Sequence, residues 1–170
     1  LWWFVHSRSR PLPAKIDVHS VWTEHLNAVA NGATTQIVLP DLNVPARYLS
    51  DLDRIAERVT ELNLSGDDLS QGIHKIAGCP HLKILHLRTE LGDAEIERLA
   101  QLRELEVLDL PLALDVTDKG LQALSQHPRL KLIRLRAPQL SDAGLPPLAT
   151  LPELRWLHLM EVPLTDAGLE

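Results

Sequence analysis

The sequence contains one cysteine, few aromatic residues and no excess of positive charge. Aromatic residues make up 4% of the 170 residues, so leucine, isoleucine, valine and alanine must fill the core. The single cysteine, Cys79, excludes a disulfide framework and a cysteine-rich metal site. The net charge of -6 does not fit a general nucleic-acid-binding protein, which usually carries a positive excess.

The sequence also lacks the signatures of common catalytic and cofactor sites. It has no G-x-S-x-G nucleophile elbow, no G-x-G-x-x-G fingerprint and no P-loop. His74, Cys79, His81 and His86 lie close together in the chain, but their spacing matches no standard zinc site. We expect Cys79 to be buried and these histidines to lie at the surface. The sequence therefore predicts a non-enzymatic protein with no catalytic residue, metal or cofactor.

An internal repeat is the strongest pattern in the chain. The frame apolar-x-x-apolar-x-Leu begins at Val59, Leu82, Leu105, Leu130 and Leu154, and these starts are 23, 23, 25 and 24 residues apart. A degenerate sixth frame, in residues 34–39, precedes them. A fixed period of this length is typical of solenoids, in which each unit buries its apolar edge only against its neighbours.

Each unit reads as a strand followed by a short helix. In LKILHL, residues 82–87, apolar and polar residues alternate, which predicts a strand with Leu85 and Leu87 inward. The segments VTDKGL, LSDAGL and LTDAGL then place a hydroxyl residue and an aspartate at the start of a helix. The hydroxyl is a good N-cap, and the aspartate adds negative charge to the first turn. The pairs are Thr117–Asp118, Ser141–Asp142 and Thr165–Asp166.

These segments resemble leucine-rich repeats of the ribonuclease-inhibitor-like and cysteine-containing types, and GCPHLKILHL, residues 78–87, is close to the second type. The resemblance implies an α/β leucine-rich-repeat solenoid with a parallel strand ladder on the concave face and short helices on the convex face. The asparagine or cysteine that usually follows the strand in such repeats is absent. The first residues, LWWFVHSRSR, resemble the junction in bacterial membrane-anchored leucine-rich-repeat proteins, where a membrane segment ends in Trp-Trp.

Three regions follow from these patterns. We expect residues 1–13 to hold the end of a membrane anchor and a linker, and residues 14–58 to form an N-terminal helical cap and a degenerate first repeat. Residues 59–170 hold five leucine-rich repeats, the last one truncated, which indicates a fragment of a longer protein. The cap helix is expected around Trp22, Leu26 and Val29, whose spacing is helical, with Gly32 at its end.

The first residues also bear on localisation. Aromatic residues followed by Arg8 and Arg10 are typical of a membrane helix that ends at the lipid–water interface. We expect membrane association through an N-terminal anchor, with the solenoid on the cytoplasmic side. The alternative is a soluble cytoplasmic protein whose N-terminus is simply apolar.

The outward side chains of the strands form three predicted rows, and these are the candidate functional surface. They combine an apolar stripe with arginines, which is the composition of a protein interface. We therefore expect a partner protein or peptide with an acidic and partly apolar surface. The alternatives are that the stripe is only sheet packing, and that the chain is the regulatory or targeting part of a larger enzyme. The predicted partner-binding residues are Ile84, His86, Arg88, Val107, Asp109, Leu132, Arg134, Arg136, Trp156 and His158.

Overall fold

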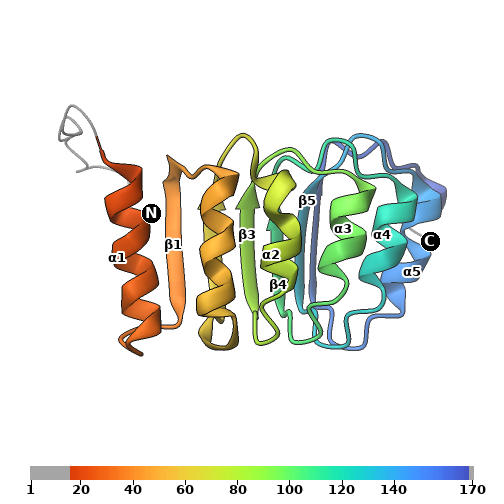
Figure 1. The fold of residues 1–170 in the computed structure, drawn as a ribbon. Helices are drawn as coiled ribbons and strands as arrows, with labels where there is room; N and C mark the ends of the chain where they lie inside the picture. The colour runs from red at the N-terminus through yellow and green to blue at the C-terminus, as the bar shows by residue number, and fades with distance from the viewer. Residues whose placement is uncertain (1–15, 169–170) are drawn as a thin grey trace, which may run out of the picture.

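The computed structural model describes residues 16–168, and its strands form one parallel sheet (Figure 1). The sheet has six strands in chain order, each paired with the next. Helices alternate with the strands and cover one side of the sheet, so the predicted α/β class is confirmed. The strands are β1 (Gln36–Asn43), β2 (Glu61–Ser65), β3 (Ile84–Arg88), β4 (Val107–Leu110), β5 (Leu132–Arg136) and β6 (Trp156–Met160).

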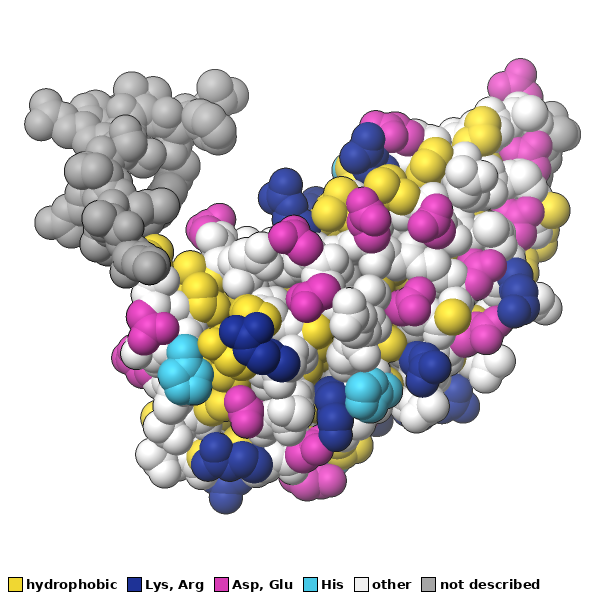
Figure 2. All heavy atoms as spheres, turned by 45° about the horizontal axis from the view of Figure 1, so that its top comes forward, with side chains coloured by type: hydrophobic (Ala, Val, Ile, Leu, Met, Phe, Trp, Pro, Cys, Tyr) yellow, Lys and Arg dark blue, Asp and Glu magenta, His cyan; other side chains and the backbone are white. Residues whose placement is uncertain are grey.

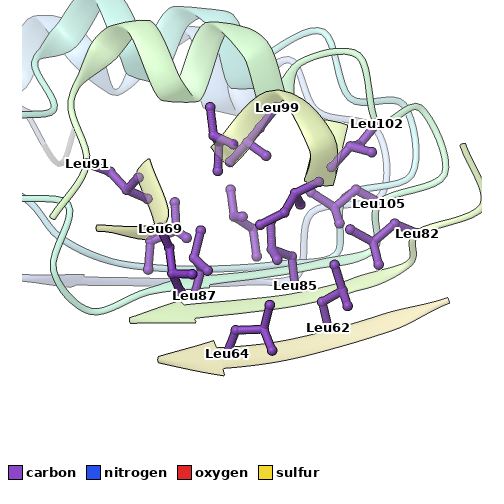
Figure 3. Packing of buried hydrophobic residues seen from close by; sticks show 14 of the residues in the cluster. Leu62, Leu64, Leu69, Leu82, Leu85, Leu87, Leu91, Leu99, Leu102 and Leu105 are labelled. Atoms are coloured by element: carbon purple, nitrogen blue, oxygen red, sulfur yellow. The ribbon is translucent and has the colours of Figure 1, made fainter. Parts of the chain in front are cut away.

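The apolar residues of the repeated frame lie in register across the sheet. Leu62 pairs with Leu85, Leu85 with Leu108, and Leu108 with Ile133, and all four side chains are fully buried. Because side chains alternate along a strand, the leucine two residues further on in each frame, such as Leu64 or Leu87, points to the same side. Figure 3 shows Leu62, Leu64, Leu85 and Leu87 between the strands and the helical layer. The sequence prediction of inward leucines is confirmed.

The strand β1 covers most of the degenerate frame of residues 34–39 and adds one strand to the sheet before β2. Within β1, Ile37 pairs with Leu62 and Leu39 with Leu64, and both β1 side chains are buried. The register becomes irregular after Leu39: Leu39 pairs with Leu64, but the next residue of β2, Ser65, pairs with Asn43. This strand therefore extends the buried rows although its sequence departs from the frame.

The edge strand β6 shows how far burial depends on a neighbour. Leu157 occupies the register position of Ile133, yet it is 42% exposed whereas Ile133 is fully buried. Ile133 lies between β4 and β6, while β6 pairs only with β5 among the described residues. A leucine of the frame is thus buried by the strands and helices on both sides of it, as expected for a solenoid.

The helices of the repeats are short, as predicted. Thr117 caps the helix α4 (Asp118–Leu124) by accepting the N–H of Lys119, and Ser141 accepts the N–H of Ala143 in the same way. Pro146 and Pro147 begin a helix of one turn that follows a separate 3-10 turn, which confirms the predicted distortion of that unit. The helices of this layer are α2 (Ile73–Ala77), α3 (Asp93–Leu99), α4 (Asp118–Leu124) and α5 (Pro146–Ala149).

The N-terminal helix α1 (Val18–Ala30) packs beside β1 at one end of the helical layer (Figure 1). Asp17 caps it by accepting the N–H of His19, and Gly32 follows it with a positive φ of 76°. Trp22 is fully buried, and its indole N–H donates to Asp51 at 3.0 Å. A helix therefore lies where the spacing of Trp22, Leu26 and Val29 predicted one, and it packs beside β1.

The predicted membrane anchor in residues 1–13 lies outside the described residues. Within residues 16–168, no helix has both the length and the apolar composition that crossing a bilayer requires.

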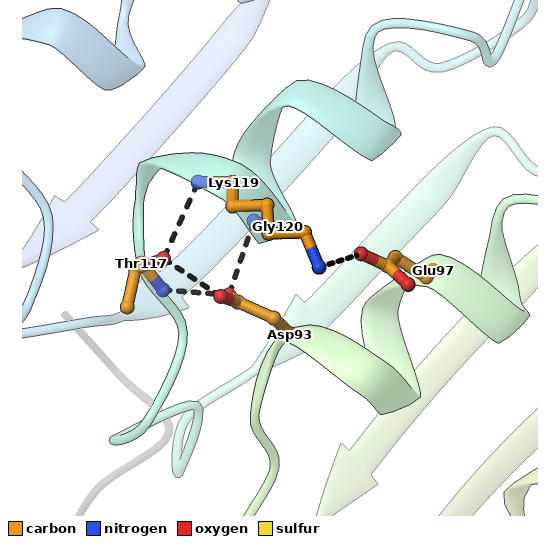
Figure 4. Close-up of polar contacts among 5 residues, drawn as sticks. All are labelled: Asp93, Glu97, Thr117, Lys119 and Gly120. Carbon is orange, nitrogen blue, oxygen red and sulfur yellow. Dashed lines mark hydrogen bonds and ion pairs between the residues drawn. The ribbon is translucent and has the colours of Figure 1, made fainter.

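Adjacent repeats are also joined by hydrogen bonds that the sequence analysis did not predict. Asp93, at the start of α3, accepts bonds from the backbone N–H of Thr117, its hydroxyl and the N–H of Gly120 (Figure 4). These bonds measure 2.8, 2.7 and 3.0 Å. The carboxylate thus satisfies N–H groups at the start of the next helix, which have no partner within that helix. We call this arrangement the aspartate ladder.

The aspartate ladder continues along the chain. Asp118 accepts the N–H and hydroxyl of Ser141, and Asp142 accepts the N–H and hydroxyl of Thr165. The predicted placement of the aspartates in the first turn is confirmed. Each aspartate has a second role, because it also binds the cap residue of the following repeat. The hydroxyl–aspartate pair therefore recurs because each aspartate holds the hydroxyl residue of the next copy.

His127 is the one fully buried histidine among residues 16–168. Its ring nitrogens lie 3.1 Å from the backbone oxygens of Leu124 and Leu99. Burial lowers the pKa of His127 below 6.5, although these two oxygens oppose the shift. The unfolded chain therefore binds a proton at His127 more readily than the folded chain does.

This burial predicts a pH dependence of stability. As the pH falls below about 6.5, the unfolded state gains a proton at His127 before the folded state does, so the free energy of unfolding decreases. In His127→Leu this part of the pH dependence should disappear, since leucine does not titrate. Urea unfolding of both proteins between about pH 5 and 8 measures the difference. If the free energy of unfolding changed with pH equally in both proteins, His127 would have the same pKa in the folded and the unfolded state.

Candidate functional site

The outward side chains of the sheet form a surface that we call the strand face. It lies opposite the helices, and the strand register arranges its residues in rows across the sheet. The first row is Glu61, Ile84, Val107, Leu132 and Trp156. The second row is Asn63, His86, Asp109, Arg134 and His158.

The third row is less regular than predicted. Arg88 pairs with Ser65, and Arg136 pairs with Met160. Between them, β4 ends at Leu110, so Pro111 lies outside the strand. The structure therefore brings all ten predicted residues onto one face, with a break in the third row at β4.

The apolar stripe of the first row ends in an exposed tryptophan. Ile84, Val107 and Leu132 are half-buried, whereas Trp156 on β6 is 60% exposed. Exposed aromatic side chains beside arginine are enriched in protein interfaces. The neighbouring positions of the second row, Arg134 and His158, are both exposed.

Asp109 joins two basic side chains at the centre of the second row. Its Oδ2 accepts a bond from Nη1 of Arg134 at 3.1 Å and lies 3.1 Å from Nδ1 of His86. The Asp109 side chain is only 14% exposed, so the neighbours on both sides cover it. Arg134 therefore has a counter-ion within its own row.

The three arginines of the strand face differ in their pairing. Arg134 pairs with Asp109, and Nε of Arg136 lies 2.8 Å from Glu161, whose carboxylate raises the pKa of Arg136. Arg88 is exposed and has no ion-pair partner among the described residues. The predicted basic character of the face is thus reduced, and its unpaired positive charge lies at Arg88.

A hollow of about 180 Å³ lies on the strand face at the carboxyl ends of β1 to β4. Arg88, His86 and Asp109 line it, together with Asn63 on β2 and Asp41 on β1. Asn63 and Asp41 are not among the predicted partner-binding residues. Asp41 was missed because β1 departs from the repeated frame.

Cys79, His81 and His86, which lie close together in the sequence, have different surroundings in the structure. Cys79 is fully buried, its thiol bonds to the backbone oxygen of Lys75, and burial raises its pKa to about 12. His86 lies on the strand face, while His81 is exposed between Glu57 and Glu104. No group of three or more His, Cys, Asp or Glu residues within 16–168 is arranged to hold a metal ion.

The helical side of the molecule differs from the strand face. In the view of Figure 2, acidic and basic side chains are interspersed, and no large patch of one sign gathers there. Several of these charges pair with each other, such as Lys119 with Glu97 and Lys75 with Asp53.

Comparison with known proteins gives no further assignment. No protein-family model matches the sequence, and no curated protein matches it.

Proposed function

We propose that this chain is a leucine-rich-repeat protein and that it binds a protein partner on the strand face without catalysing a reaction. The repeat period, the sheet in chain order and the helices on one side support the first part. The rows of the strand face support the second, because they place an apolar stripe beside arginine side chains.

The observation that carries the proposal is the apolar row of Ile84, Val107, Leu132 and Trp156 beside the arginines of the strand face. Trp156, on the edge strand β6, is 60% exposed. Burying it against a partner would remove this apolar area from solvent, and Arg134 beside it would set the orientation of an acidic group. The partner class that fits is a peptide or protein with apolar and acidic side chains close together.

The test uses peptides as defined probes. A phage-displayed library of random peptides, about twelve residues long, is selected on the immobilised chain, and the affinity of selected peptides is measured by fluorescence anisotropy. In the double variant Trp156→Ala, Arg134→Glu, we expect the affinity to fall by about 20-fold, which is the loss typical of an interface anchor.

The control is Arg98→Glu, which makes the same charge change on an exposed residue in the last turn of α3. It should leave the affinity unchanged. Selected peptides that bind the double variant as tightly as the unmodified chain would contradict the proposal, as would a failure to select any binder.

A further inference from the structure

The hollow beside Arg88 is the most specific feature of the strand face. It combines an exposed guanidinium that has no ion-pair partner within residues 16–168 with two further polar side chains, Asn63 and His86. Asn63 and His86 pair directly in the register of β2 and β3, and Arg88 lies two residues after His86 on the same face. These groups therefore converge on one small space.

The donors of the hollow fit a carboxylate. A guanidinium presents several N–H groups in a fixed plane that matches a carboxylate, and the Asn63 amide supplies another donor. Asp109 also lines the hollow: Arg134 and His86 contact its Oδ2, whereas its Oδ1 is buried without a hydrogen-bond partner among the described residues. Because two carboxylates repel each other, a bound carboxylate must lie toward Arg88 and Asn63. Asp41 on the rim is exposed, and it would repel a second negative charge placed beside the first.

We propose that the hollow binds a single acidic side chain of an extended peptide segment, with its carboxylate on Arg88 and Asn63. This inference rests on the proposed function, since the same segment would place an apolar residue on Trp156. The volume of about 180 Å³ accommodates one side chain. The repulsion from Asp41 selects an isolated acidic residue over a run of acidic residues.

The register of the sheet sets the spacing within the segment. Trp156 is in register with Ile84, three strands away from β3, and Arg88 lies four residues beyond Ile84. With about 4.8 Å between strands and about 3.3 Å per residue along them, the two sites are about 20 Å apart. An extended chain covers this distance in about six residues.

The experiment examines the sequences of peptides selected on the 170-residue chain. We expect enrichment of one Asp or Glu with an apolar or aromatic residue about six positions away. Affinity for such a peptide should fall about tenfold in Arg88→Glu. Arg88→Met keeps the apolar stem of the side chain and should also weaken binding. Selection on Arg88→Glu should instead enrich Lys or Arg at the position of the acidic residue.

The outcomes separate this inference from the proposed function. Binding that depends on Trp156 but is unchanged in Arg88→Glu and Arg88→Met overturns the hollow as an acid site and leaves the proposed function in place. Binding that is insensitive to Trp156→Ala and to both Arg88 variants overturns both, and so does the absence of any binder. Arg98→Glu again serves as the matched charge control, and circular dichroism verifies that each variant is folded.

Discussion

Asp93→Ala is expected to lower the free energy of unfolding by about 3 kcal/mol. The substitution removes the acceptor of three hydrogen bonds and leaves the N–H groups of Thr117 and Gly120 without these partners. Bonds to a charged acceptor contribute more than neutral ones, and half-buried N–H groups are costly when unpaired. Because Asp93 lies in one repeat and Thr117 in the next, the contact between the two repeats is weakened.

Urea unfolding followed by circular dichroism measures this change. Asp93→Asn keeps one carbonyl oxygen for the two N–H groups and should cost only about 1 kcal/mol. Glu24→Ala, an exposed acid on α1, is the control and should be neutral. Equal stability of Asp93→Ala and Glu24→Ala would show that the aspartate ladder does not stabilise the fold.

We also expect the stability contributed by the Asp93 carboxylate to depend on pH in the acidic range. Burial raises the pKa of Asp93, but the hydrogen bonds from Thr117 and Gly120 outweigh this effect and hold the pKa below 3.8. The stabilisation is therefore present above about pH 3.8 and is lost as the pH falls through the lower, folded-state pKa. The difference in stability between the unmodified chain and Asp93→Asn should shrink over that range.

Gly120→Ala is expected to destabilise the protein by about 2 kcal/mol, although alanine is the better helix former by about 1 kcal/mol. A methyl group on Gly120 would overlap Oδ1 of Asp93 and lie 3.1 Å from Cγ1 of Val116. Three hydrogen bonds fix this carboxylate, so it has little freedom to move away. Gly144 and Gly168 meet Asp118 and Asp142 in the same manner.

A double-mutant cycle identifies the cause of this effect. If the methyl group collides with the carboxylate, Gly120→Ala in the Asp93→Ala background should cost nothing or stabilise the helix slightly. The free energies of unfolding of the four proteins give the coupling energy, expected at about 2 kcal/mol. A coupling energy near zero would place the cost elsewhere, for example at Val116.

The sequence indicated several elements because their signals are local. The alternation in residues 82–87 gave the inward direction of Leu85 and Leu87, and the spacing of Trp22, Leu26 and Val29 gave the cap helix. The glycine that recurs in the segments VTDKGL, LSDAGL and LTDAGL is a further local signal. A glycine recurring inside a short helix is unfavourable on its own, so its recurrence indicates a close approach of another group.

The pairing of the charged residues was not predictable in the same way. Arg136 was predicted to bind a partner, but Glu161 lies beside it, and the backbone of Glu161 adopts a positive φ of 59°. Arg134 was expected to face a partner, and it also bonds to Asp109 on the neighbouring strand. A long charged side chain can form an ion pair with any of several residues within its reach. Which pair forms depends on strand ends and loop conformations, which the repeat pattern does not specify.

The sequence by itself determined the period, the order of the strands and the side of each strand that enters the core. These properties follow from apolar residues spaced to match a strand and from units that gain burial only from adjacent units. Only the tertiary structure decided which aspartate binds which cap residue, which of the three strand-face arginines has no ion-pair partner within residues 16–168, and where the hollow lies. Those features join residues more than twenty positions apart, and their geometry exists only after the strands have paired in register.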